Sequence, residues 1–218
     1  MGRIKAAIFD MDGLMVETES LYFQAESEVA RRYGKTFTRE VMEKMMGYKA
    51  TRSIQIMMEA LLIQGDVHEI ETLRDDLYRE LLLKGVKPMD GLFDLLCWLE
   101  SHGFRKAVAT SSKPIFKEII FDRLHLHDRF ELVVTGEDVS RGKPSPEIYR
   151  LALHRLGLGP RQCVVLEDSA VGLKSAKGAG CSCIVVPNDY TRNQDFSGAD
   201  LVAPHLFHEG IRRFFQTT

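Results

Sequence analysis

The feature that most constrains the fold is a short apolar run that ends in two carboxylates. The run extends from Ala6 to Phe9 and contains no polar residue. Asp10 and Asp12 follow it, one residue apart, and Gly13 comes next. An unbroken apolar run of this length is typical of a strand that is buried on both faces, as in a parallel sheet. The run therefore predicts an α/β protein.

The two carboxylates would stand where open α/β sheets bind their ligands, beyond the carboxyl end of a strand. Two like charges this close together are costly unless a cation or a shared proton relieves them. A solvated Asp-x-Asp-Gly turn is the alternative, because Asp and Gly both favour turns for local reasons. We interpret Asp10 and Asp12 as the centre of a functional site.

The second half of the chain alternates between helical and strand-like segments. Five further runs read as strands: 106–109, 132–135, 163–166, 183–186 and the short pair 201–202. Helical patterns lie between them, and a closing helix is expected over 209–215. One of these helices has Ser145 as its expected cap and Pro146 in its first turn. Strands separated by helices predict a doubly wound parallel sheet.

Residues 19–85 follow a different pattern, which is helical throughout. Leu21, Ala25, Val29 and Tyr33 recur at helical spacing, and two later stripes of Met and Leu do the same. This insert is too uniform to belong inside a parallel sheet. We therefore expect two domains: a core made of residues 1–14 and 88–218, and a helical domain over 15–87. Hinges are expected near 14–18 and 85–88.

Composition and charge exclude several classes of partner. The formal net charge is -2 and the basic residues are dispersed, so no basic field attracts nucleic acid or an anionic membrane. No apolar run is long enough to span a bilayer, and the first strand begins too early to leave room for a signal peptide. The four cysteines form no Cys-x-x-Cys pair and read as free thiols in a reducing compartment. We expect a cytoplasmic monomer.

Polar and charged groups stand at the ends of the other strands as well. The pairs Thr110 and Ser111, Glu137 and Asp138, and Glu167 and Asp168 each follow a predicted strand, and Lys143 lies in a basic loop before a helix. Singly, each signal is weak, because a Gly-Lys-Pro turn is often a plain loop and a Glu-Asp pair often serves the helix dipole. Together they suit phosphoryl transfer, which needs an in-line nucleophile, charge neutralisation and a proton for the leaving oxygen.

Each group has a role that fits this chemistry. Asp10 would attack phosphorus, and Asp12 would protonate the leaving oxygen and then deprotonate water. Thr110 and Lys143 would hold the phosphoryl oxygens. Mg²⁺ prefers hard oxygen ligands, which the carboxylates of Asp10 and Asp168 and a backbone carbonyl in the 10–12 loop would supply.

The motifs at these positions resemble the four signatures of the haloacid dehalogenase (HAD) superfamily, in the same order. They are Asp10-Met11-Asp12-Gly13, Thr110-Ser111-Ser112, Gly142-Lys143-Pro144 and Glu167-Asp168-Ser169. The resemblance covers nearly the whole chain, and the helical insert is similar to the small helical cap of the phosphoglycolate phosphatase and β-phosphoglucomutase branch. It implies a Rossmann-like core with an inserted cap. It also implies a magnesium site at Asp10, Asp12, Glu167 and Asp168, with Asp168 the more direct ligand of the last pair.

The resemblance also excludes some relatives. The dehalogenases of the superfamily work without the second aspartate and without metal, so the presence of Asp12 argues against dehalogenation. Response-regulator receivers also phosphorylate an aspartate on a parallel sheet, but they lack the Asp-x-Asp-Gly motif and the helical insert. A non-enzymatic phospho-aspartate switch is therefore a distant alternative.

A phosphosugar mutase of the β-phosphoglucomutase type is the nearer alternative. Such mutases usually carry a histidine in the hinge just after the position of Thr18, and the next four residues here include none. They also place an arginine in the cap soon after a glycine like Gly47, and that position is Ala50, although Lys49 and Arg52 are close. Because a mutase needs a second anion clamp, these departures favour a monophosphatase.

We therefore predict a Mg²⁺-dependent phosphatase that hydrolyses a small phosphorylated metabolite, of the sugar phosphate or nucleoside phosphate class. The reaction would pass through an aspartyl-phosphate, and the cap would close over the site and choose the substrate. Substrate-binding side chains are expected at Thr18, Ser111, Ser112, Lys113, Lys49 and Arg52, with Tyr22 as a further candidate.

Overall fold

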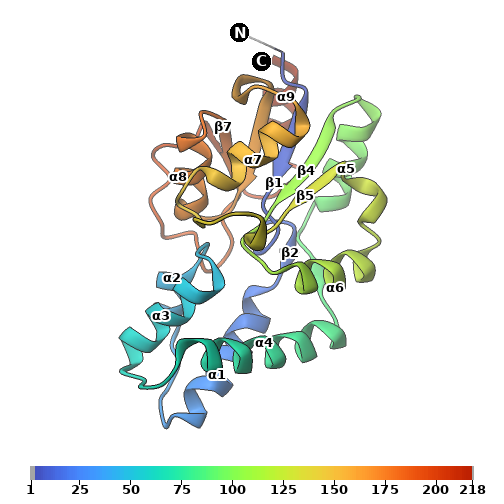
Figure 1. Ribbon diagram of the computed structural model, residues 1–218. Coiled ribbons are helices and arrows are strands. Elements are labelled where there is room, and N and C mark those ends of the chain that lie inside the picture. The colour runs from blue at the N-terminus through green and yellow to red at the C-terminus, as the bar shows by residue number, and fades with distance from the viewer. Residues whose placement is uncertain (1–2, 218) are drawn as a thin grey trace.

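The computed structural model describes residues 3–217, and its centre is a six-stranded parallel sheet with the strand order β5-β4-β1-β6-β7-β8 (Figure 1). The strands are β1 (Ala6–Phe9), β4 (Arg105–Ala109), β5 (Leu132–Val134), β6 (Cys163–Glu167), β7 (Ser182–Val185) and β8 (Leu201–Val202). All neighbouring pairs run parallel. The predicted α/β fold with a parallel sheet is confirmed. The expected N-terminal segment begins with Met1 and Gly2, which lie outside the described residues.

Helices cover both faces of this sheet, which makes the fold doubly wound. They are α5 (Leu92–Ser101), α6 (Pro114–Leu124), α7 (Glu147–Leu156), α8 (Ala170–Gly178) and α9 (Glu209–Thr217), with short 3-10 turns η1 (His127–Arg129), η2 (Gly136–Asp138) and η3 (Pro160–Gln162). Ala7 and Phe9 of β1 pack into a hydrophobic cluster with residues of α5, α6 and α9. Ala6 and Ile8 pack into a second hydrophobic cluster with residues of α7 and α8. Alternate strand residues are thus buried on opposite faces.

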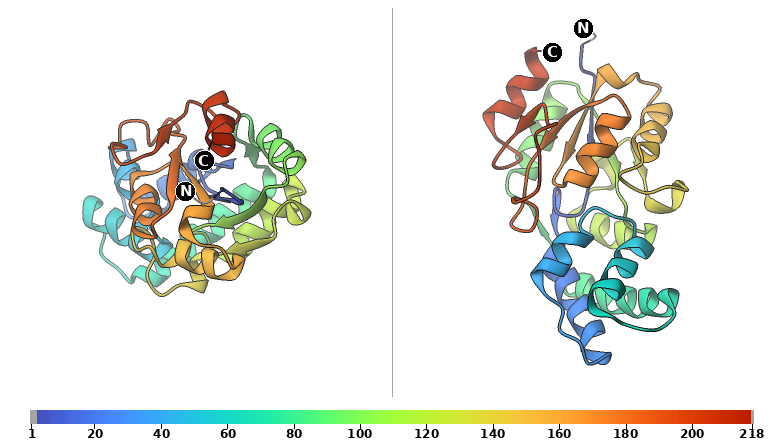
Figure 2. Two further views of the ribbon diagram at one scale, coloured as in Figure 1. Left: turned by 90° about the horizontal axis from the view of Figure 1, so that it is seen from above. Right: turned by 90° about the vertical axis from the view of Figure 1, so that its left-hand side faces the viewer.

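Four helices form a separate layer at one end of the sheet, far from the two chain ends (Figures 1 and 2). They are α1 (Glu19–Arg32), α2 (Arg39–Met45), α3 (Ala50–Leu61) and α4 (Val67–Lys84). They enclose an apolar cluster of their own, which includes Val29, Met42, Ile54 and Ile70. We refer to these four helices and their connections as the cap.

Two short strands cross between the cap and the rest of the chain. They are β2 (Val16–Glu17) and β3 (Lys87–Pro88), and they pair antiparallel with each other. The chain passes through this ladder once on the way into the cap and once on the way out, where the sequence predicts hinges. The division into a core of residues 1–14 and 88–218 and a cap of residues 15–87 stays a prediction.

One helix begins later than the sequence predicts. The cap residue of α7 is Pro146 and its first helical residue is Glu147, so the expected start at Pro146 is wrong by one residue. Ser145 instead belongs to a turn, because its N–H donates to the carbonyl of Gly142 and its own carbonyl accepts the hydroxyl of Ser175. These two bonds hold Ser145 outside the helix.

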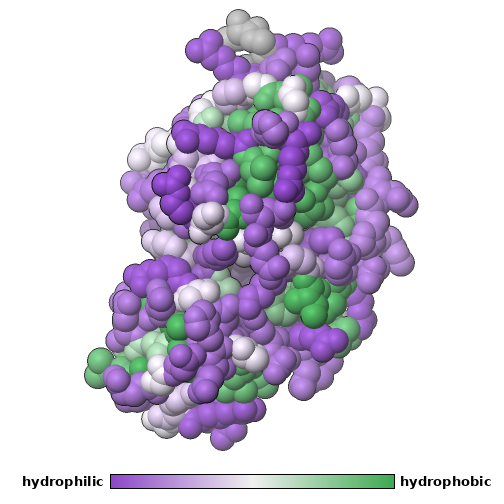
Figure 3. Space-filling view, in the orientation of Figure 1, coloured by the Kyte–Doolittle hydropathy of each residue, from purple (hydrophilic) through white to green (hydrophobic). Residues whose placement is uncertain are grey.

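Hydrophilic residues cover most of the face shown in Figure 3, and hydrophobic residues reach the surface there in a few separate areas. Among residues 3–217, no helix combines the length and the apolar character that crossing a membrane requires.

Candidate active site

The sheet order places the predicted site residues together. Strand β1 lies between β4 and β6, so the segments that follow these three strands meet at one edge of the sheet. The N–H of Asp10 donates to the carbonyl of Leu166 at 3.0 Å, which extends the pairing of β1 with β6. The N–H of Thr110 donates to the carbonyl of Val134 at 3.0 Å. Asp10, Thr110 and Glu167 thus lie at the ends of three neighbouring strands.

Lys143 joins two of these carboxylates. Its Nζ donates to Oδ1 of Asp10 at 2.5 Å and to Oε1 of Glu167 at 2.6 Å, and all three side chains are buried. Burial acts to lower the pKa of Lys143, but the two carboxylates outweigh it and hold the pKa above its usual value. Lys143 therefore stays charged, and it reaches the site from a loop that is distant in sequence.

Glu167 is held from several sides. The hydroxyl of Tyr149 donates to Oε1 at 2.5 Å, and the hydroxyl of Ser169 donates to Oε2 at 3.2 Å. The N–H of Asp168 also donates to Oε2, at 3.1 Å. A carboxylate with this many donors is fixed in one orientation, so Glu167 positions Lys143 and the adjoining Asp168.

Asp10, Glu167 and Asp168 form a group that can hold a metal ion. One oxygen from each lies within 4.8 Å of the others, and all three are buried. Burial raises the pKa of Asp10 to about 7, with Lys143 opposing the shift. Burial, with the charges of Glu167 and Asp10, raises the pKa of Asp168 well above its usual range. Lys143 alone leaves an excess of buried negative charge, which a divalent cation with hard oxygen ligands would neutralise.

Asp12 lies beside this group, and its carboxylate has other partners. Its Oδ2 accepts the hydroxyls of Ser112 at 2.7 Å and Thr110 at 3.2 Å, and its Oδ1 accepts the hydroxyl of Tyr78 at 3.4 Å. The carboxylate of Asp12 therefore lies outside the group that Asp10, Glu167 and Asp168 form. The hydroxyl of Thr110, predicted to bind phosphoryl oxygens, points to Asp12 in this arrangement.

Above these residues lies a pocket whose wall comes partly from the core and partly from the cap. Its empty volume is about 740 Å³, including its open mouth. Core residues in its wall include Asp10, Asp12, Ser111, Ser112, Lys113, Phe116, Lys143 and Asp168. Cap residues in its wall include Glu19, Tyr22, Glu26, Met42, Met45, Met46, Gly47, Tyr48, Ala50, Ser53 and Arg74. A molecule bound there would contact both parts at once.

The structure brings some of the predicted substrate residues into this wall and leaves others outside. Ser111, Ser112, Lys113 and Tyr22 line the pocket. Thr18 is fully buried and does not line it.

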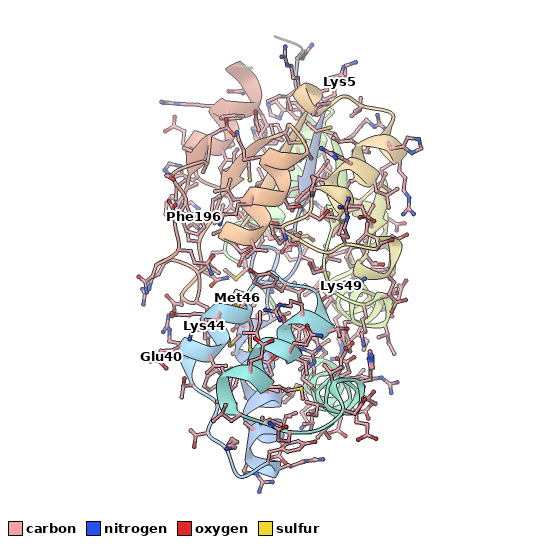
Figure 4. The ribbon with its side chains drawn as sticks, turned by 60° about the vertical axis from the view of Figure 1, so that its left-hand side comes forward. Lys5, Glu40, Lys44, Met46, Lys49 and Phe196 are labelled. Carbon is pink, nitrogen blue, oxygen red and sulfur yellow. The ribbon has the colours of Figure 1, made fainter. Side chains whose placement is uncertain are left out.

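The two basic residues predicted in the cap lie outside the pocket as well. Figure 4 shows Met46 and Lys49 on the side of the cap that faces the core. The Nζ of Lys49 donates to the carbonyl of Val139 at 3.0 Å, and Arg52 pairs with Glu59 at 3.1 Å. Both line a separate groove beside Gly142, so Lys49 joins cap to core here.

Several polar residues of the site carry no sequence motif. Glu19 begins α1 and is buried against Gly13, and burial raises its pKa to about 8. Asn188 donates to Oδ2 of Asp168 at 2.9 Å and to the carbonyl of Gly13 at 3.2 Å. An acidic residue in a first helical turn usually interacts with the helix dipole, so the sequence does not mark Glu19 as a site residue.

The chain is similar to several known proteins. The profile of the family described as haloacid dehalogenase-like hydrolase matches residues 7–186. The phosphorylated carbohydrates phosphatase of Thermotoga maritima is 36% identical over 177 residues, covering 81% of this chain and 82% of that protein. A β-phosphoglucomutase of Bacillus subtilis is 29% identical over 91% of this chain and 88% of its own length. The crystal structure of a mutant of CbbY from Rhodobacter sphaeroides in complex with xylulose-(1,5)bisphosphate superposes with a TM-score of 0.84. It is 32% identical and covers 93% of this chain and 95% of that one.

Proposed function

Because the chain belongs to the haloacid dehalogenase-like hydrolase family, we propose that it is a Mg²⁺-dependent phosphatase of the family's small-cap branch. Its substrate is a small phosphate monoester of the sugar phosphate or nucleoside phosphate class, and it acts as a cytoplasmic monomer. The observation that carries the proposal is Lys143, whose ammonium joins Asp10 to Glu167 at 2.5 and 2.6 Å beneath a pocket.

Asp10 is the nucleophile in this proposal. Lys143 occupies its Oδ1, and within residues 3–217 no hydrogen bond is found on Oδ2, which is left to attack. As Oδ2 bonds to phosphorus, the bond from phosphorus to the leaving oxygen breaks, and an aspartyl-phosphate forms. Lys143 holds the carboxylate in one orientation and balances the charge that gathers on the phosphoryl oxygens.

Asp12 is the general acid and base. The hydroxyls of Ser112 and Thr110 hold its Oδ2, so the carboxyl is oriented while it remains in the pocket wall. It gives a proton to the leaving oxygen in the first step. In the second step it takes a proton from water, whose oxygen displaces Asp10 from phosphorus and releases phosphate.

Mg²⁺ fits the donor set, because Asp10, Glu167 and Asp168 offer three buried carboxylates and one nearby lysine cannot balance them all. When bound, the ion would neutralise charge on the transferring phosphoryl group. Asp10 and Asp168 would hold it, together with a backbone carbonyl of the 10–12 loop. Glu167 and Asn188 would orient Asp168, and the Asn188 amide already donates to that carboxylate at 2.9 Å.

Replacing the nucleophile tests the proposal directly. Asp10→Asn should abolish Mg²⁺-dependent hydrolysis of p-nitrophenyl phosphate, because an amide cannot form the aspartyl-phosphate. The matched control is Asp94→Asn, the same change at an exposed position of α5. Both variants are compared with the wild type by steady-state kinetics and by circular dichroism. Retained turnover in a folded Asp10→Asn variant would remove Asp10 as the nucleophile.

A phosphosugar mutase is the second candidate, because one relative is named a β-phosphoglucomutase. Incubation with β-glucose 1-phosphate and a trace of the 1,6-bisphosphate separates the two activities. A mutase forms glucose 6-phosphate, whereas a phosphatase releases glucose and inorganic phosphate. We expect release of inorganic phosphate, and glucose 6-phosphate as the main product would favour the mutase.

A further inference from the structure

Two cations in the pocket wall pair with carboxylates other than those of Asp10 and Glu167. Arg74 comes from α4 in the cap and is only 3% exposed. Its guanidinium lies over the ring of Tyr22, 5.3 Å from the ring centre. Lys113 comes from the core, in the loop before α6. Lys143 is paired with Asp10, so Arg74 and Lys113 are the cations of the described wall that are left for the part of a substrate beyond the reacting phosphate.

Both cations are already paired with carboxylates that stand behind the wall. Asp75 bridges them, since its Oδ1 accepts Nε of Arg74 at 2.8 Å and its Oδ2 accepts Nζ of Lys113 at 2.5 Å. Lys113 also pairs with Glu71 at 2.6 Å. A third carboxylate, Glu26, lines the pocket and lies 3.5 Å from Arg74. We call these five residues the cap charge cluster.

The cap charge cluster carries no net positive charge. The charges of Arg74 and Lys113 are balanced by those of Asp75 and Glu71. Glu26 adds a further negative charge when it is ionised and nothing when it is protonated. The sum is therefore zero or negative in either state. A second phosphate would need an excess of cationic donors, and it would instead be brought close to three carboxyl groups.

An uncharged group finds suitable partners in the same place. Arg74 and Lys113 keep N–H protons that their carboxylates do not use, because a guanidinium has five and an ammonium has three. The carboxyl of Glu26 accepts hydrogen bonds, and the nearby side chains of Met42 and Met45 are apolar. A short carbon skeleton with hydroxyl groups suits both parts of this wall. Its hydroxyls would hydrogen-bond to the polar side chains, and its carbons would pack against the methionines.

We propose that the cap charge cluster selects monophosphates whose remote end is an uncharged, hydroxyl-bearing group, and that Asp75 and Glu71 discriminate against a second phosphate. The proposal rests on the proposed phosphatase function and adds the substrate class and the residues that set it. It differs from what the relative CbbY holds, which is a sugar bisphosphate.

A competition assay tests this selection without requiring that either sugar be the natural substrate. Fructose 1-phosphate and fructose 1,6-bisphosphate are added separately to the Mg²⁺-dependent hydrolysis of p-nitrophenyl phosphate, and their inhibition constants are compared. We expect the monophosphate to compete at least about tenfold more strongly, a difference of one decade in binding constant.

The discriminating variants remove one negative charge each. Asp75→Asn raises the net charge of the cluster by one, so the preference should fall about tenfold or reverse. Glu71→Gln should act in the same direction, and it serves if Asp75→Asn fails to fold. Asp76→Asn is the matched control, because it makes the same change on the exposed side of α4 and should leave the preference unchanged.

Three results would overturn the proposal while p-nitrophenyl phosphate is still hydrolysed. The first is a bisphosphate that competes as well as the monophosphate in the wild type. The second is that Asp75→Asn and Glu71→Gln keep the same preference as Asp76→Asn. The third is that neither sugar competes at millimolar concentration. If p-nitrophenyl phosphate itself is not hydrolysed, the failure belongs to the proposed function instead.

Discussion

At the residue scale, two sets of buried carboxylates differ in their partners. At the end of the sheet, Asp10 and Glu167 share Lys143, and Asp168 lies beside them. Glu26 lies in the cap, where Arg74 is its cation at 3.5 Å. Burial raises the pKa of Glu26 to about 7, and Arg74 opposes the shift. The stability of the protein should therefore depend on pH through a residue outside the catalytic group.

The sign of this dependence follows from the direction of the shift. The ordinary pKa of a glutamate is 4.5 and that of folded Glu26 is about 7, so the folded protein holds the extra proton between these values. The stabilisation is complete below pH 4.5 and is lost as the pH rises through 7. A shift of this size corresponds to a free energy on the order of 3 kcal/mol.

Glu26→Gln isolates this contribution, because glutamine stays neutral at every pH. From pH 5 to pH 8, the free energy of unfolding of the variant should fall less than that of the wild type, by a few kcal/mol. Urea denaturation at both pH values measures the difference. Glu28→Gln, at a half-buried position of the same helix, should show the same fall from pH 5 to pH 8 as the wild type. Equal falls in the wild type and in Glu26→Gln would contradict the prediction.

Apart from Lys143, the motif residues could be predicted because each follows a strand that the sequence reveals. Asp10, Thr110 and Glu167 stand at predicted strand ends, and the structure brings them to one edge. Glu26, Arg74 and Tyr149 could not be predicted in the same way. They lie within helices, where spacing shows which face is apolar but not which polar residue is buried in a pair.

At the scale of elements, the sequence predicts what is long and patterned. Strand β1 has the predicted bounds, because an unbroken apolar run defines it. The strands β2 and β3 have two residues each, too few to show any periodicity. They pair with each other because the chain enters the cap and leaves it at neighbouring positions.

Helix α8 shows how an element positions the site. Its third residue is Gly172, and a Cβ there would overlap the carboxylate of Glu167. Alanine normally stabilises a helix interior by about 1 kcal/mol relative to glycine. Here the methyl group would displace Glu167 from Lys143, so the usual gain should not appear.

Gly172→Ala should therefore lower kcat for p-nitrophenyl phosphate at least about tenfold, since it disturbs the orientation of groups that act in the transition state. It should also lower the melting temperature. Gly178→Ala, at the end of the same helix, is the comparison. A Cβ there would have Cβ of Pro146 as its nearest neighbour, at 3.3 Å. That variant should keep most of its activity. Full activity in Gly172→Ala would show that Glu167 has room to move.

At the scale of the whole molecule, cap and core meet at the loop between α2 and α3. The carbonyl of Gly47 accepts the hydroxyl of Ser111 at 3.3 Å, and Lys49 donates to Val139 at 3.0 Å. The φ angle of Gly47 is +80°, and a Cβ there would come within 2.7 Å of Oγ of Ser169. At Gly47, which lines the pocket, the loop comes this close to the core because the residue has no side chain.

Gly47→Ala should weaken that closure more than it weakens the fold. The left-handed backbone costs alanine about 1 kcal/mol, and the methyl group would also push the cap away from Ser169.

Gly34→Ala supplies the control, because its φ is +68° and no atom lies within 4 Å of the added Cβ. Both variants should lose similar stability by urea denaturation, since they share the strain. Only Gly47→Ala should lose kcat/KM, by about tenfold or more, because a cap held open admits water and misplaces the substrate. Equal kcat/KM in the two variants would mean that contact of this loop with the core is not needed for turnover.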